Sequence, residues 1–156
     1  MELPDLVGWT RSALRPLPET DFGFSVAYDH PGVAVTLYQY ARSYEEIPDG
    51  IGEAVRSEIE GAEEAIQQAV QFGAWDGADK VESGERKLGE SEAVALWSHH
   101  ALTIQGREVS SHTFIWGHNK RIFKVRSTGD KLESPQENAA LMEILTAFGK
   151  ACTNDF

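Results

Sequence analysis

The sequence has a single cysteine, Cys152, which excludes an intrachain disulfide and a metal site built from cysteines alone. It has no run of about twenty apolar residues, so nothing in it predicts a membrane-spanning segment. The motifs HExxH, CxxC, GxSxG, GxGxxG and GxxxxGKS/T are also absent. We therefore predict no cofactor and no dedicated metal site. The acidic start, Met1 to Asp5, lacks a secretory signal and indicates a cytoplasmic protein, or an exported one if a signal has been removed.

Basic residues are scarce as well. The chain has 14 Lys and Arg against 25 Asp and Glu, a formal net charge of −11. Such a charge repels phosphates and excludes a general nucleic-acid binder. Residues 1–75 hold 4 Lys and Arg against 13 Asp and Glu, so the acid is concentrated in the first half. A solvated helix face explains this concentration, and a basic partner protein is the alternative.

The hydrophobic period changes at Ile47-Pro48-Asp49-Gly50. Before this turn, alternating apolar residues predict strands over Leu6–Leu14, Phe22–Tyr28 and Val33–Ala41. After it, apolar residues recur every third or fourth position and predict a helix over Ile51–Phe72, ended by Gly73.

The second half repeats this order. Strands are predicted over Lys80–Lys87, Glu92–Ile104, Glu108–Trp116 and Arg121–Ser127. A last helix follows, capped by Ser134 with Pro135 and Glu137, and its apolar face holds Leu141, Ile144, Leu145 and Phe148. The prediction is one α+β domain over residues 1–156, a mostly antiparallel sheet of six to seven strands with two helices, in the order β-β-β-α-β-β-β-β-α. The first helix must cover one sheet face, and we expect the last helix on the other.

The segment Phe22-Gly23-Phe24-Ser25-Val26-Ala27-Tyr28 is an aromatic-glycine strand, followed by a Pro-Gly turn and a strand rich in Thr and Tyr. It resembles the opening of small, uncharacterised bacterial proteins of the Mog1/PsbP-like group. The resemblance implies an antiparallel sheet sandwiched by helices. It also implies an accessory or binding role rather than catalysis.

Three histidines fall on neighbouring predicted strands. If the turn at Gln105-Gly106-Arg107 has three residues, His100 pairs with His112, and if it has two, His99 does. Two imidazoles side by side suit a shared metal ion or an acid-base pair. The alternative is a cross-strand pair that binds nothing, since no motif supplies a third ligand.

Other candidates are cationic or aromatic. Lys120, Arg121, Lys124 and Arg126 form a basic patch that would bind an anion or an acidic partner, or pair with the protein's own carboxylates. Trp97 and Trp116 either mark an exposed binding groove or belong to the core.

These observations predict a soluble, non-catalytic binding or accessory domain that acts through a sheet face or through a pocket between sheet and helix. Its partner would be another protein or a small ligand, and Trp97, His99, His100, His112 and Trp116 are the first residues to inspect. Two alternatives remain. One is a small metal-assisted or acid-base hydrolase that uses His99 or His100 with His112, and the other is a structural subunit of a homodimer.

Overall fold

The computed structural model describes residues 2–18, 23–42, 44–130, 135 and 138–153. Eight strands and two helices follow one another along the chain. They are β1 (Thr10–Arg11), β2 (Arg15–Leu17), β3 (Gly23–His30), β4 (Val33–Tyr40), α1 (Glu53–Gln71), β5 (Gly77–Lys87), β6 (Val94–Ile104), β7 (Arg107–His118), β8 (Arg121–Gly129) and α2 (Ala139–Thr153).

The strands form one antiparallel sheet in the order β1-β3-β4-β8-β7-β6-β5, with β2 also paired to β3. The predicted α+β class and order of elements are confirmed. The first predicted strand differs, because the chain over Leu6–Leu14 does not form one continuous strand but reaches the short β1 and then β2. At this break the Ala27 N–H donates its hydrogen bond to the Ser12 hydroxyl. In a continuous strand pair a backbone carbonyl would accept it. Pro16 is tolerated within β2 because that strand lies at the sheet's edge.

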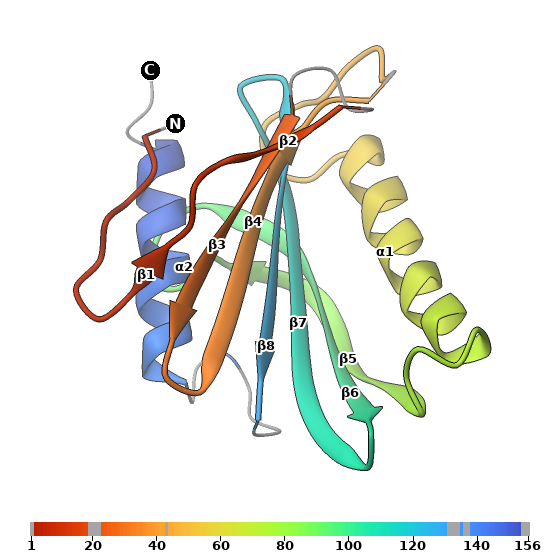
Figure 1. Ribbon diagram of the computed structural model, residues 1–156. Coiled ribbons are helices and arrows are strands. Elements are labelled where there is room, and N and C mark those ends of the chain that lie inside the picture. Colours follow the sequence, from red (N-terminus) through yellow and green to blue (C-terminus); the bar gives the residue numbers. More distant parts are fainter. Residues whose placement is uncertain (1, 19–22, 43, 131–134, 136–137, 154–156) are drawn as a thin grey trace.

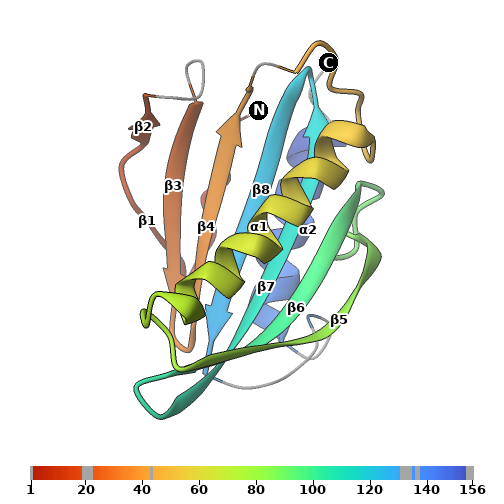
Figure 2. The same cartoon turned by 90° about the vertical axis from the view of Figure 1, so that its right-hand side faces the viewer.

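The two helices lie on opposite faces of the sheet (Figure 1). Figure 2 shows α1 running obliquely across one face, with α2 behind the sheet. The main core lies between the sheet and α2, where Leu141, Ile144 and Phe148 pack against the strands. Beneath α1 the apolar residues instead form two separate clusters, one containing Val55 and the other Ile66. No helix in the described part of the chain is long and apolar enough to cross a membrane.

The first helix agrees with its sequence pattern, whereas α2 begins at Ala139 rather than at Pro135, its predicted first residue. The first helix lies within the predicted Ile51–Phe72, and Gly73 follows it with a φ of +79°, a conformation that suits glycine. The predicted caps Ser134 and Glu137 lie outside the described residues. Within the described part, the Asn138 Oδ1 accepts the N–H of Leu141 at the start of α2.

A partly buried carboxylate attaches α1 to the end of β4. Glu58, on α1, accepts hydrogen bonds from the hydroxyls of Tyr40 and Tyr44 and from the guanidinium of Arg42. Burial alone would raise the pKa of Glu58, but these three donors together hold its pKa below the ordinary value. The carboxylate therefore stays ionised and ties the helix to the sheet.

We predict that Glu58→Gln lowers the free energy of unfolding by about 1–3 kcal/mol near pH 7, because hydrogen bonds to a charged acceptor are lost. A carboxyl whose pKa is lowered in the folded state stabilises the protein above its unfolded-state pKa. That stability is lost as the pH falls through the lowered pKa. The difference in unfolding free energy between wild type and variant, measured by urea unfolding, should therefore decrease as the pH falls from about 7 to about 3.

The control is Glu60→Gln, an exposed carboxylate on the same helix. It removes the same charge and should change stability little at any pH. Equal losses in the two variants would show that Glu58 does not anchor the helix.

Candidate functional site

The sheet face beneath α1 carries a band of polar side chains across its middle. One row runs from strand to strand through residues that stand directly opposite one another, and a second row occupies the next position on the same face. We call both rows the polar belt: Thr36, Arg126, Thr113, Ser98 and Ser83 in the first, and Thr128, Ser111, His100 and Lys80 in the second. The belt passes between the two apolar clusters, so apolar packing does not explain its position.

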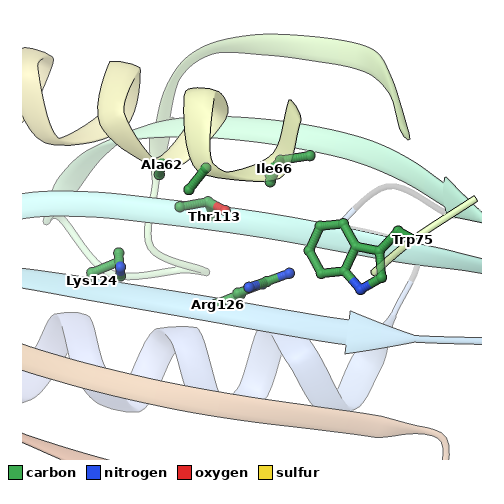
Figure 3. Close-up of a pocket in the computed structure, with 7 residues that line it drawn as sticks. Ala62, Ile66, Trp75, Thr113, Lys124 and Arg126 are labelled. Carbon is green, nitrogen blue, oxygen red and sulfur yellow. The ribbon is translucent and has the colours of Figure 1, made fainter. Parts of the chain in front are cut away.

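A cavity of about 100 Å³ opens where the belt meets the side of α1. Figure 3 shows Arg126 extending from β8 toward Trp75, with Thr113 of β7 beside it and the α1 residues Ala62 and Ile66 above. This space exists because the helix carries small side chains here. Ala62 and Ala65 line the cavity, whereas the larger Ile59 and Ile66 lie about one helical turn before and after Ala62. Lys124 completes the polar part of the lining.

Two cations in this cavity form no ion pair with the described carboxylates. Among the described residues, no carboxylate lies within 4.0 Å of Lys124 or Arg126. The partners that they do have are aromatic rings. The Lys124 Nζ lies 4.5 Å from the ring centre of Tyr38, and the Arg126 Cζ lies 5.1 Å from that of Trp75. Rings orient a cation without neutralising it, so both charges remain available to an anion.

The surroundings confirm that these charges are costly. Burial lowers the pKa of both Lys124 and Arg126. The Glu58 carboxylate favours the charged form of Lys124, although its oxygens are already used by Tyr40, Tyr44 and Arg42. β8 therefore holds two partly desolvated cations, and neither forms an ion pair with a carboxylate of the described residues.

Lys120 and Arg121, the other two predicted cations, do not join this cavity. Lys120 is exposed in the two-residue turn between β7 and β8, with a φ of +62°. Arg121 begins β8 and alternates onto the opposite face from Lys124 and Arg126. The structure thus brings together only two of the four residues of the predicted basic patch.

The three candidate histidines are divided between the faces. The turn after β6 has two residues, Gln105 and Gly106, both with positive φ, and this register places His99 opposite His112. Their rings stack on the α2 side with centroids 4.2 Å apart. His100 lies on the α1 side, within the polar belt.

The His99–His112 pair is buried in a hydrogen-bonded network. The indole N–H of Trp97 donates to the Nδ1 of His112 over 3.2 Å. Ser110 lies 3.3 Å from the Nε2 of His112 and 2.8 Å from the Nε2 of His99. Since the His112 Nδ1 accepts, its proton is on Nε2 and points to the Ser110 oxygen, whose own proton then reaches His99. Both nitrogens of His112 are thus used inside the protein, and the described residues contain no cluster of three potential metal ligands.

The candidate tryptophans also belong to the core. Trp97 and Trp116 are both buried on the α2 side, where the Trp116 indole N–H donates to the sulfur of Cys152 over 3.4 Å. Arg86 covers the Trp97 ring with its Cζ 3.9 Å from the ring centre. Trp97 also borders a hollow of about 220 Å³ between α1 and the strands β5 and β6, but the residue is only 2% exposed.

Several residues of the cavity and belt escaped the sequence interpretation, chiefly Ala62, Trp75, Ser98, Ser111 and Thr113. The strand residues carry a usable signal, because polar side chains recur at alternate positions in strands that are otherwise apolar. Trp75 has no such signal, since it lies in an irregular segment after α1.

The first prediction from this site concerns stability. Lys124→Met should raise the free energy of unfolding by roughly 1 kcal/mol in a buffer of weakly binding ions, because an uncompensated, partly buried charge is removed. Thermal or urea unfolding measures the change, and Lys150→Met, on the exposed side of α2, is the control. A clear loss of stability in Lys124→Met would mean that the ammonium has a stabilising partner.

The second prediction concerns the histidine network. Long-range ¹H–¹⁵N NMR near neutral pH should show His112 with its proton on Nε2 and His99 with its proton on Nδ1. Burial lowers the pKa of His99, so its ring should accept a second proton only at a lower pH than a free histidine does. A proton on the Nδ1 of His112 would contradict the network.

No protein-family model, no curated protein and no solved structure matches this chain. The resemblance to the Mog1/PsbP-like group stays a prediction from the sequence. The function is therefore argued from the cavity itself.

Proposed function

We propose that this domain binds a small anionic molecule, without converting it, in the cavity between α1 and the sheet. The observation that carries the proposal is the pair of uncompensated cations, Lys124 and Arg126, in the cavity wall. A protein with 25 Asp and Glu has acid enough to neutralise them, yet both stay without a carboxylate among the described residues. An anionic ligand would compensate both charges at once.

The two cations suit an oxyanion. The planar guanidinium of Arg126 can donate two parallel hydrogen bonds to a carboxylate or a phosphate, and the ammonium of Lys124 adds a point charge. The Trp75 ring beside the guanidinium limits its motion, so less side-chain freedom is lost on binding.

The cavity restricts the size of the ligand. Its volume of about 100 Å³ has room for a few water molecules. Sites for drug-sized ligands are several times larger, at about 300–1,000 Å³. The buried part of the ligand is therefore one small group, such as a carboxylate or a phosphate.

The histidine pair supports catalysis less well than the cavity supports binding. A hydrolase would need an imidazole nitrogen free to accept a proton or bind a metal. His112 uses both of its nitrogens within the network of Trp97 and Ser110. The hydrolase and the homodimer remain untested predictions from the sequence.

The test is binding of acetate, phosphate and sulfate at constant ionic strength, measured by calorimetry and by the shift in melting temperature. A ligand at 100 times its Kd should add about 2.7 kcal/mol to the stability of the wild type. Arg126→Gln should weaken binding by roughly tenfold or more, because a charge-assisted hydrogen bond is lost. Ala62→Leu keeps every charge but fills the cavity, and it should also abolish binding.

Lys150→Gln serves as the matched control, because it removes one cation from the exposed surface of α2. It should bind as the wild type does. The proposal fails if no anion binds, or if Lys150→Gln weakens binding as much as Arg126→Gln does.

A further inference from the structure

Three buried polar atoms beneath α1 have no hydrogen-bond partner among the described residues. They are the Oγ of Ser98, the Nδ1 of His100 and the Oγ of Ser111, and each of these residues is only 1% exposed. Buried polar groups in folded proteins are almost always paired, since leaving one unpaired costs free energy. Three such atoms from two adjacent strands indicate a place built to hydrogen-bond something other than the protein.

None of these three residues lines the anion cavity itself, but they lie beside it on the same face of the sheet. Ser98 stands directly opposite Thr113, which lines the cavity, and His100 stands opposite Ser111. Residues paired in this way have β-carbons about 4.5–5.5 Å apart. Ser111 precedes Thr113 on the same face of β7, about 6.6 Å away at ~3.3 Å per residue. A group attached to the bound anion thus needs to extend by two or three bonds, followed by one hydrogen bond of about 2.8 Å, to reach them.

The chemistry of the three atoms selects a neutral group. Each serine hydroxyl can donate and accept one hydrogen bond. Burial lowers the pKa of His100, so its ring is a neutral imidazole. Glu63 of α1 favours protonation of this ring, while Lys80 of β5, His99 of β6 and Arg126 of β8 oppose it. Glu63 and Lys80 are themselves paired at 3.1 Å.

We infer that the ligand of the anion site carries a hydroxyl group close to its anionic group, and that Ser98, His100 and Ser111 bind this hydroxyl. The inference rests on the proposed anion-binding function and narrows it to short 2- or 3-hydroxy acids. The anionic end contacts Arg126 and Lys124, and the hydroxyl enters the polar belt beneath Ala62. A second anionic group is disfavoured there, because none of the three side chains is cationic.

Matched pairs of acids test the inference. Lactate and propionate differ by one hydroxyl, as do 3-hydroxybutyrate and butyrate, and each pair has one charge. In at least one pair the hydroxy acid should bind the wild type about tenfold more tightly, which corresponds to 1.4 kcal/mol. In Ser98→Ala or Ser111→Ala this preference should fall to about threefold or less, while the affinity for the deoxy acid stays nearly unchanged.

The serine variants should fold well, because each removes an unpaired buried hydroxyl rather than a contact. Ser83→Ala is the matched control, since Ser83 lies in the same row but is exposed on β5. It should keep the full preference for the hydroxy acid.

The outcomes separate the two proposals. If deoxy acids bind as tightly as hydroxy acids, and Arg126→Gln weakens both, the hydroxyl site is wrong and the anion site stands. A preference for hydroxy acids that survives in both serine variants would also overturn the inference. If no acid binds at all, both proposals fail.

Discussion

The attachment of α1 through Glu58 is the constraint on which the α1 side of the sheet depends. A helix normally stays on a sheet by burying a continuous apolar stripe. Here the stripe crosses a polar belt, so its contacts divide into a cluster around Val55 and another around Ile66. The Glu58 carboxylate, with its three donors, adds a directional attachment at the end of β4. With the helix held at that end, its residues Ala62, Ala65 and Ile66 form one wall of the cavity.

The same anchor explains why the cavity keeps its positive charge. Glu58 is the carboxylate of α1 that acts on Lys124, but Tyr40, Tyr44 and Arg42 use its oxygens. Glu63, the next acid on the inner side of the helix, is paired with Lys80. Both carboxylates are thus bound to other groups, and neither forms an ion pair with Lys124 or Arg126. The two partly buried cations lower the stability of the fold at this point, and such a local loss of stability is typical of binding sites rather than of structural cores.

Much of the fold could be predicted from the sequence, because alternation and helical period determine which side chains share a face. That rule alone puts Lys124 and Arg126 on one face of a strand. Ser98 could not be placed next to the cavity residue Thr113, because that pairing depends on a turn of two rather than three residues after β6. Trp75 could not be placed at all, since an irregular segment brings it over Arg126. Whether a cation has an acidic partner also depends on such long-range packing.

The two faces of the sheet provide an internal comparison for the functional argument. Adjacent positions on β6 and β7 place the same kinds of side chain, histidine and serine, on opposite faces. On the α2 side, His99, Ser110 and His112 satisfy one another and Trp97, as a structural network must. On the α1 side, Ser98, His100 and Ser111 are just as buried but lack partners among the described residues. The same strands pair such groups on one face, so the unpaired atoms beside two uncompensated cations point to a ligand rather than to poor packing.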